Sequence, residues 1–449
     1  MQSARFSTLL LTFAAVLCLI SSQNAAAATL CVNPAGSGGC YKTISLAVSH
    51  ASAYDVINVG PGTYKEDVVI GMPLSLLGAG PHQSKIDATN LANGIFVDGF
   101  DNPGLSHVTI SGFTVKNAQW EGVLVVSVSD VTITNNTISN NTQAPAVFTG
   151  DPNGCNGQPS FEMDETGDCG GGLHLMGVRD SIVFGNTITQ NDDGILASDE
   201  TAPTHDVLII RNSVINNPGE CGVVLASHPP VGATPGTAPH HGVYHITVEG
   251  NDVENNGVTV GGAGVGIFSD GIGQGRSSQH VIIHNKLVGN GIGGVALHSH
   301  VGPSFGLPAD DMDGNQIIGN YIAGNLADTD DTATPGRVGI NINSGGGGSP
   351  VRGTVISQNV IRDEDIDVAV NTPAIVKVHL NDLLGGKTGV GNICAYDKAS
   401  CSGGASGTEN FWGCPSGPGG HGCSTASGPN VTTTPWLPTP STGDDQGQH

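Results

Sequence analysis

Four residues with acid–base side chains stand at equivalent positions of a repeated pattern. Each is the sixth residue after a glycine that begins an apolar, strand-like segment; the four are Glu200, His228, Asp270 and His300. Neighbouring strands lie ~4.8 Å apart, so we expect these carboxylates and imidazoles to alternate along one line. They suit general acid–base chemistry, with His228 and His300 as the catalytic base and acid. Glu200 and Asp270 would orient the imidazoles or hold a cation. A purely structural ladder of alternating charges is the competing interpretation.

The same alignment predicts which side chains line a binding surface. The first and third residues after each glycine are apolar and should point inward, whereas the second and fourth should face a groove. We therefore expect a groove floor that binds substrate, and the residues assigned to it are His174, Phe268, His298, Asn341 and Asn343, with Asp199 one position further on. An exposed floor has no structural need for imidazole, which favours a functional role for the two histidines.

An acidic loop after the strand that ends at His300 has part of the pattern of a calcium-binding loop. Its candidate ligands are Asp311, Asp313 and Asn315, which would supply carboxylate and amide oxygens to Ca²⁺. A solvated acidic loop without metal is the alternative. No other cofactor is predicted.

These motifs sit in a chain that repeats. Asn136, Asn186, Asn212, Asn251, Asn285, Asn320 and Asn359 each begin a similar step, and a second asparagine follows five residues later in all but the last, where Glu364 stands. The shortest intervals are 26 residues (Asn186 to Asn212) and 22 residues (Asn359 to Asn381). A period of this size indicates a solenoid. Asparagine suits its turns and can bond along the axis as a ladder, so both asparagine columns are assigned to the scaffold.

The N-terminal part contains a recognisable family pattern. Residues 43–53 have the apolar spacing of a helix, and residues 55–80 contain three short apolar strands separated by glycine and proline turns. The run GPGTY-x-E-x-V-x-I within it resembles the start of pectinesterase-like and other pectin-lyase-like proteins. The chain is thus similar to the right-handed parallel β-helix superfamily. The expected fold is all-β: a single-stranded right-handed parallel β-helix of roughly 10–12 coils, with an N-terminal helical cap and a disulfide-stapled C-terminal cap.

This resemblance implies a function but not one reaction. Members include pectate lyases, polygalacturonases, alginate epimerases and periplasmic metal-maturation factors, so it implies a polysaccharide lying in a groove along one sheet. Asp192 and Asp193 match the paired aspartates of polygalacturonase-like members, but the accompanying signatures are not in register. The hypothesis is an enzyme that cleaves or modifies a polysaccharide as a hydrolase, lyase or epimerase. The alternative is a non-catalytic glycan-binding or structural surface protein.

Composition limits the partners and the location. The formal charge of −24 disfavours nucleic acid, because phosphate binding needs a basic surface. Residues 1–28 resemble a secretory signal peptide that is too short to span a membrane. We expect a secreted or periplasmic monomer with a β-helix over residues 29–438, a disordered tail over residues 439–449, and no membrane insertion.

The cysteines after the signal segment fall in close pairs, apart from Cys221. In an exported protein such pairs predict disulfides that staple loops. The predicted pairs are Cys31–Cys40, Cys155–Cys169, Cys394–Cys401 and Cys414–Cys423. Zinc is the competing interpretation, although the pairs lack CxxC spacing. Cys221 is either a buried apolar cysteine or a thiol with a catalytic role.

Overall fold

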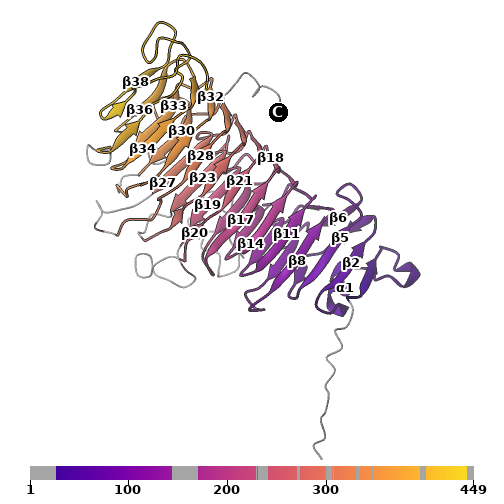
Figure 1. The fold of residues 1–449 in the computed structure, drawn as a ribbon. Coiled ribbons are helices and arrows are strands. Elements are labelled where there is room, and N and C mark those ends of the chain that lie inside the picture. The colour runs from indigo at the N-terminus through magenta and orange to yellow at the C-terminus, as the bar shows by residue number, and fades with distance from the viewer. Residues whose placement is uncertain are drawn as a thin grey trace, which may run out of the picture.

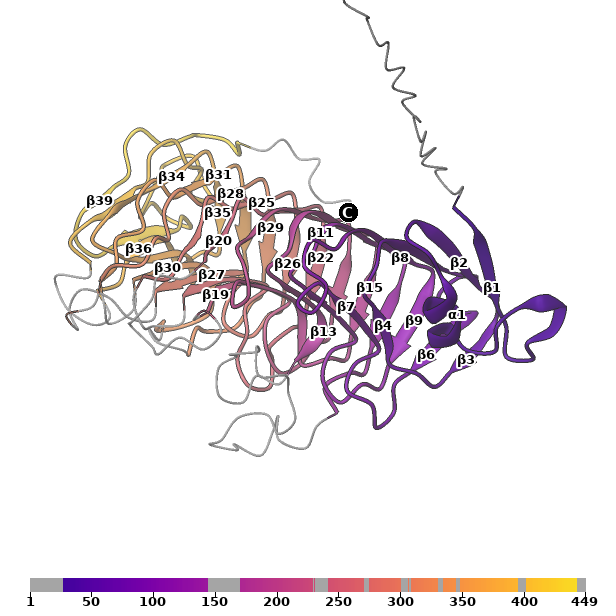
Figure 2. The ribbon, with the colours of Figure 1, turned by 90° about the horizontal axis from the view of Figure 1, so that it is seen from below.

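The computed structural model describes residues 27–143, 170–228, 230, 241–269, 274–299, 306, 308–329, 334–344, 348–394 and 401–441. Within these ranges the chain winds into a right-handed parallel β-helix, in which most coils add one strand to each of three parallel sheets (Figure 1). The predicted fold class is confirmed. In Figure 2 the coils stack from the helix α1 (Ile44–His50) at one end to the C-terminal strands at the other.

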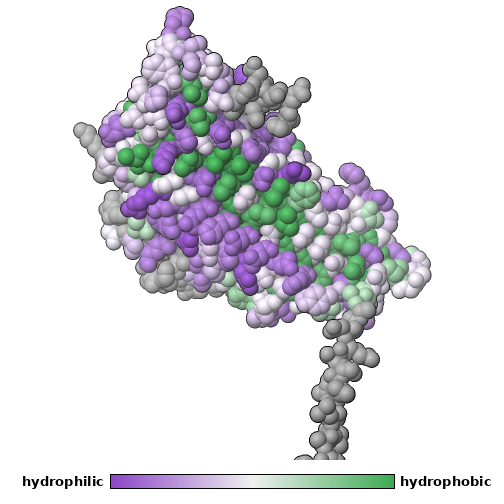
Figure 3. Space-filling model, viewed as in Figure 1, coloured by the Kyte–Doolittle hydropathy of each residue, from purple (hydrophilic) through white to green (hydrophobic). Residues whose placement is uncertain are grey.

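Sheet 1 contains 16 of the described strands. They are β1 (Thr29–Val32), β2 (Asp55–Val59), β5 (Leu74–Gly78), β8 (Ser106–Ser111), β11 (Ser129–Thr134), β14 (Arg179–Phe184), β17 (Thr204–Ile210), β20 (Val243–Tyr244), β21 (Thr247–Glu249), β24 (Ser277–Ser278), β25 (Val281–Ile283), β28 (Gln316–Ile318), β31 (Val355–Ser357), β34 (Ile375–His379), β37 (Gly404–Ser406) and β39 (Val431–Thr432). Its outer surface is partly apolar, and Figure 3 shows hydrophobic side chains gathered in a band across this face. Phe184 of β14 and Leu208 of β17, each 40 % exposed, are outward side chains of sheet 1.

Sheet 2 contains 11 described strands. They are β3 (Gly62–Tyr64), β6 (Ser84–Asp87), β9 (Phe113–Lys116), β12 (Thr137–Ser139), β15 (Thr187–Thr189), β18 (Ser213–Ile215), β22 (Asp252–Glu254), β26 (Lys286–Val288), β29 (Tyr321–Ala323), β32 (Val360–Arg362) and β35 (Asp382–Leu384).

Sheet 3 contains 12 described strands, including those aligned on glycine in the sequence. They are β4 (Val68–Ile70), β7 (Ile95–Asp98), β10 (Val123–Val126), β13 (Gly171–Met176), β16 (Asp193–Ser198), β19 (Val223–Ser227), β23 (Val265–Ser269), β27 (Val295–Ser299), β30 (Val338–Asn343), β33 (Ile366–Asn371), β36 (Thr388–Asn392) and β38 (Thr425–Ser427). The predicted register is confirmed, because Ile195 pairs with Val223, and Val265 with Val295.

The inside of the coil is a continuous apolar column. Valine, isoleucine and leucine side chains from all three sheets fill it, as expected for alternating strands with one face inward. The predicted N-terminal helix is present but shorter, ending at His50 because Ala51 is extended. It begins at the capping residue Thr43, whose Oγ1 accepts a hydrogen bond from the Leu46 N–H. At the other end Trp412 is fully buried and closes the column.

Two asparagine ladders run along the turns. The first ladder lies between sheets 1 and 2 and consists of Asn136, Asn186, Asn212, Asn251, Asn285, Asn320, Asn359, Asn381 and Asn410. Each Nδ2 donates to the next Oδ1 over 2.9–3.1 Å, with Asn251 to Asn285 at 2.9 Å as an example. The second ladder lies between sheets 2 and 3 and consists of Asn141, Asn191, Asn217, Asn256, Asn290, Asn325 and Glu364. The scaffold role predicted for both columns is confirmed.

Three predicted disulfides are present, and these are Cys31–Cys40, Cys394–Cys401 and Cys414–Cys423. Cys155 and Cys169 lie outside the described residues, as do residues 1–26 and 442–449. Of the predicted tail, Ser441 is described, and its N–H donates to Asp382 Oδ1 over 2.7 Å. Within the described residues, no helix has the length and apolarity needed to cross a bilayer.

Candidate functional site

The outward side chains of sheet 3 form the candidate site. Each glycine that precedes a strand of this sheet lies against the turn of the next coil, where a side chain would collide with backbone. A Cβ on Gly194, for example, would lie 2.2 Å from the carbonyl oxygen of Gly222. The coils therefore stack closely here, so residues at equivalent positions of neighbouring coils are brought into hydrogen-bonding range.

Polar side chains on or next to β10, β13, β16 and β19 lie close to one another on the outer face of sheet 3. His228 Nδ1 lies 2.7 Å from Glu200 Oε1, and Ser198 Oγ donates to Glu200 Oε2 over 2.5 Å. His174 Nε2 lies 2.7 Å from Ser198 Oγ, and His174 Nδ1 lies 3.9 Å from Glu121 Oε1. We name Glu121, His174, Ser198, Glu200 and His228 the acid–histidine network. Hydrogen bonds join its members from His174 to His228, whereas Glu121 lies beyond hydrogen-bond range of His174 and contacts it only as a charged neighbour.

All five side chains of the network are buried. The exposed fraction is 0–1 % for four of them and 5 % for His228, so His228 is the member nearest to solvent. Among the described residues, neither carboxylate oxygen of Glu121 accepts a hydrogen bond, which is unusual for a buried carboxylate. Leaving such a group without a donor is costly, so the network is not explained by stability alone.

Asp199 fixes the backbone beside the network. Its Oδ1 accepts the His228 N–H over 2.7 Å, and its Oδ2 accepts the Ser227 hydroxyl over 3.2 Å and the Gly242 N–H. Burial, together with the neighbouring Glu200 charge, raises the pKa of Asp199 to about 7. Asp199 thus holds the position of His228 through the main chain.

The pKa of Glu200 moves in the opposite direction from that of Asp199. Burial by itself would raise it, but the charge and hydrogen bond of His228, aided by His174 and Ser198, hold it below the usual value. Two adjacent carboxyl groups therefore differ in acidity, and Glu200 is the one that stays ionised to stabilise a protonated His228.

A second polar cluster lies further along sheet 3. His298 Nε2 lies 2.8 Å from Asp328 Oδ2, which also accepts the Asn341 Nδ2 over 2.7 Å. The Phe268 ring packs against His298 with 5.4 Å between ring centroids. His298, Asp328 and Asn341 are fully buried, so this cluster is a buried triad centred on the Asp328 carboxylate.

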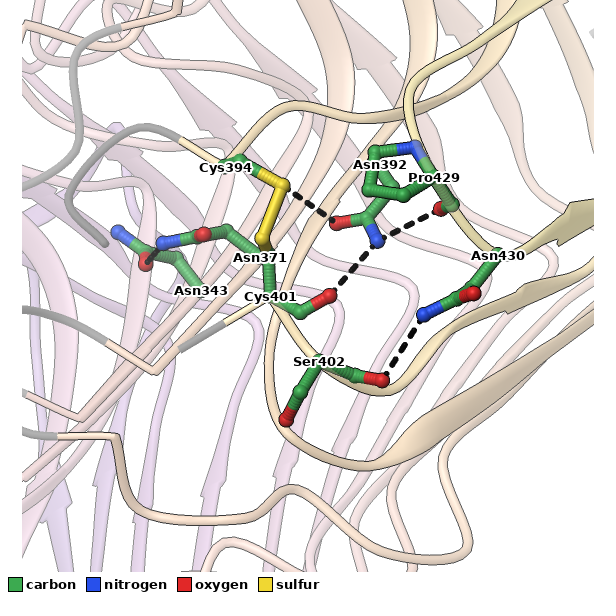
Figure 4. The surroundings of a disulfide bond; sticks show 8 residues. All are labelled: Asn343, Asn371, Asn392, Cys394, Cys401, Ser402, Pro429 and Asn430. Atoms are coloured by element: carbon green, nitrogen blue, oxygen red, sulfur yellow. Dashed lines mark hydrogen bonds between the residues drawn. A yellow bond between two sulfur atoms is a disulfide. The ribbon is translucent and has the colours of Figure 1, made fainter. Parts of the chain in front are cut away.

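Asn343 belongs to the C-terminal end of the sheet. Its Oδ1 accepts the Asn371 Nδ2 over 3.0 Å. Figure 4 shows this pair beside the Cys394–Cys401 disulfide, where Asn392 donates to the carbonyl oxygens of Cys401 and Pro429. Asn343 is thus part of the packing beneath the C-terminal cap.

The expectation of an open groove floor is wrong for most of the residues assigned to it. His174, His298, Asn341, Asn343 and Asp199 are each at most 1 % exposed, and Phe268 is half-buried. The alternation rule placed these side chains on the outer face correctly, but it carries no information on what covers that face. The two remaining members of the predicted acid–base line, Asp270 and His300, lie outside the described residues.

The three residues of the predicted calcium loop have separate partners. Asp311 pairs with Arg276 over 3.3 Å, and Asp313 Oδ1 accepts the Arg352 N–H over 2.6 Å. Asn315 is buried and its Oδ1 accepts the His280 N–H, which is a scaffold contact. Within the described ranges no three His, Cys, Asp or Glu side chains converge as metal ligands. Calcium binding stays a prediction.

Sequence reasoning missed Glu121, and it placed Asp310 and Asp328 in acidic loops without connecting them to sheet 3. Glu121 precedes Gly122 as Asp193 precedes Gly194, so extending the glycine alignment by one coil would have found it. Asp310 accepts the hydroxyls of Ser269 and Ser299, each over 2.7 Å. Asp310 and Asp328 come from segments outside the repeat, and no periodic signal points to them.

Comparison with known proteins agrees with this architecture. A family model described as a right-handed beta helix region matches residues 93–235, and one described as a periplasmic copper-binding protein (NosD) matches residues 167–346. The chain is a right-handed parallel β-helix protein. No curated protein matches the sequence of this chain.

Solved structures share the β-helix fold at low sequence identity. The Dettilon tailspike protein is 13 % identical with a TM-score of 0.56, over 87 % of this chain and 64 % of its own. The catalytic domain of a GH87 alpha-1,3-glucanase in complex with tetrasaccharides is also 13 % identical, with a TM-score of 0.51, over 87 % and 66 %. The Azotobacter vinelandii mannuronan C-5 epimerase AlgE4 A-module is 14 % identical with a TM-score of 0.46, over 88 % and 94 %. A structure described as Geobacillus virus E2 ORF18 is matched over only 54 % of its length.

Proposed function

We propose that this β-helix binds a polysaccharide along sheet 3 and cleaves or modifies it by general acid–base chemistry at His228. The observation that carries the proposal is the acid–histidine network, in which the ionised Glu200 orients an imidazole 2.7 Å away. A protein of the same fold, the catalytic domain of an alpha-1,3-glucanase in complex with tetrasaccharides, supports a glycan as the ligand class.

In this proposal His228 transfers the proton and the rest of the network positions it. Glu200 fixes the orientation of the imidazole by accepting the Nδ1 proton, and His228 takes a proton from the substrate. Ser198 and His174 hold the other oxygen of Glu200 in place. When His228 becomes protonated, the Glu200 carboxylate stabilises the imidazolium. His300 and Asp270 complete the predicted line of acids and imidazoles, with His300 as the partner acid.

The NosD match raises copper as a second possibility, and the described residues do not fit it. His174, His228 and His298 each face a hydroxyl or a carboxylate in a different coil, and Met176 packs among Leu124 and Val126. No step of the proposed chemistry is therefore assigned to a metal.

We also infer that the protein works outside the cytoplasm. Three disulfides staple its described loops and termini, and such bonds persist in oxidising compartments. The residues 1–28 signal segment and a periplasmic family model support the same location.

The test is a polysaccharide screen of the purified protein, with and without Ca²⁺. Reducing ends report hydrolysis and ultraviolet absorbance reports unsaturated products. His228→Ala should lower turnover by about 100-fold or more, and His300→Ala tests the second imidazole. A matched control is His284→Ala, because His284 lies at a turn between sheets 1 and 2. Turnover that survives His228→Ala would discard this site. Glycan binding without turnover in the native protein would favour the non-catalytic alternative.

A further inference from the structure

A second site lies on the outer face of sheet 1, near the C-terminal end of the solenoid. There a hollow of about 1070 Å³ is bordered by β34, β37, β39 and the segments that follow them. The outward residues of β34 are Ile375, Lys377 and His379, which form one wall. Hydroxyl groups of Ser406, Thr408 and Thr432 and the carboxylate of Glu409 lie around it. This hollow is on a different sheet from the acid–histidine network.

The backbone beneath the hollow is closely packed. Gly403 and Gly404 lie where a side chain would strike the neighbouring coil: a Cβ on Gly403 would be 1.8 Å from the Ala374 carbonyl oxygen, and one on Gly404 2.3 Å from that of Asn430. Gly404 also has a φ of 102°, a conformation that other residues rarely adopt. Two consecutive residues without side chains therefore let the coils that carry β34, β37 and β39 stack closely beneath the hollow.

The charged groups of the hollow form no ion pair among the described residues, unlike the other bases in this part of the chain. After residue 330, four described bases are paired with aspartates, and these are Arg337, Arg352, Arg362 and Lys387. Lys377 alone among the described bases of that region has no carboxylate within reach. Glu409 lines the same hollow and is exposed. Since no described ion pair joins Lys377 to Glu409, a donor and an acceptor both remain available to a ligand.

We propose that this hollow binds a short neutral oligosaccharide, independently of the chemistry proposed for sheet 3. A sugar presents hydroxyl groups around its edge and C–H groups on its face. Lys377, Glu409 and the hydroxyl side chains match the edge, and the exposed Ile375 side chain, 64 % accessible, supplies an apolar contact for the face. The opposite charges of Lys377 and Glu409 make the lining nearly balanced. A neutral sugar is therefore bound without the repulsion that a net charge of −24 imposes on an anionic glycan.

The test follows the methyl signal of Ile375 by NMR in the full-length protein. The probes are maltotriose, cellotriose and laminaritriose, with trigalacturonate as the charged comparison. At least one neutral trisaccharide should shift the Ile375 methyl signal saturably while leaving Ile215, on the outer face of sheet 2, unmoved. Lys377→Ala and Glu409→Gln should each weaken this binding about tenfold or more.

Two controls make the outcome decisive. Lys387→Ala removes a base that is already paired with Asp365, so it should leave binding unchanged. His228→Ala should also leave it unchanged, which separates failure of this site from failure of the proposed chemistry. The site is overturned if no neutral probe shifts Ile375, if trigalacturonate binds in preference, or if Lys377→Ala and Lys387→Ala behave alike.

Discussion

The asparagine ladders and the acid–histidine network both bury polar side chains along the same coils, and they do so in different ways. Every ladder asparagine such as Asn251 is neutral, repeats in each coil and both donates and accepts. The network is titratable, spans only a few coils and contains Glu121, whose carboxylate oxygens accept no hydrogen bond from the part of the chain that the structure describes. A scaffold needs buried polar groups whose hydrogen bonds are all made and which recur in each coil. Buried polar groups that lack hydrogen-bond partners and occur in only a few coils are better explained by a catalytic role.

We expect substitutions in the acid–histidine network to lower turnover and substitutions in the asparagine ladders to lower stability. Glu200→Gln keeps the size of the side chain but removes the charge that stabilises a protonated His228. We expect turnover on the polysaccharide identified in the screen to fall by about 100–1,000-fold, or about 3–4 kcal/mol in transition-state free energy. Thermal unfolding followed by circular dichroism measures the accompanying change in stability. Loss of folding in proportion to the loss of turnover would make the network structural.

The ladder should show the converse behaviour. Asn251→Ala removes the acceptor of the Asn212 N–H and Nδ2 and the donor to the Ile209 carbonyl oxygen, all inside the protein. Because these groups lose their partners without gaining water, we expect a loss of about 2–4 kcal/mol in the free energy of unfolding. Denaturant titration measures it.

Asn255→Ala is the matched control for the ladder. Asn255 is exposed with a φ of 54°, so only its tolerance of left-handed backbone is lost, at a cost of about 1 kcal/mol. Equal effects at Asn251 and Asn255 would show that the ladder contributes nothing beyond turn geometry.

The end of the second ladder provides a pH-dependent test. Glu364 replaces asparagine there, and burial raises its pKa to about 7 while its Oε1 accepts two hydrogen bonds from Asn325. A carboxyl with a raised folded-state pKa holds its proton more tightly when folded. Its stabilising contribution is therefore complete below the unfolded pKa and is lost as pH rises toward 7, by at most about 1.4 kcal/mol per pH unit.

Glu364→Gln should remove this part of the pH dependence, because glutamine keeps the acceptor and has no proton to lose. The measurement is the free energy of unfolding between pH 5 and pH 8 for both proteins. Glu249→Gln, at an exposed position, serves as the control. Parallel profiles for the native protein and Glu364→Gln would contradict the assignment.

The smallest effect is expected at the surface. Lys286 bridges Asp252 and Glu254 on the outside of sheet 2, where it is partly exposed. Exposed ion pairs contribute little, so Lys286→Gln should cost less than about 1 kcal/mol, and 0.5 M salt should reduce this cost by screening the charges. A larger loss would mean that charge on the outer faces stabilises the coils as the ladders do.

Much of the fold followed from spacing, because the repeat is a local signal that recurs. The glycine alignment predicted the pairing of sheet 3, and the asparagine spacing predicted both ladders. The pairing of Glu200 with His228 also followed, since both belong to the repeat. Asp328 and the burial of His298 did not, because they depend on segments whose length and sequence vary from coil to coil. Interruptions of the repeat therefore limit what can be predicted about the site.

The ladder spacing has a consequence for how such a protein can change. Asn141 and Asn191 are 50 residues apart in the chain, whereas Asn359 and Asn381 are 22 apart, yet the amide hydrogen bond is 2.9 Å in both. The geometry of the ladder thus does not depend on the length of the loop between two successive asparagines. A longer loop adds only a slowly growing entropic cost. New segments can be grafted beside sheet 3 without redesigning the scaffold, which makes this β-helix a frame on which binding specificity can be exchanged piece by piece.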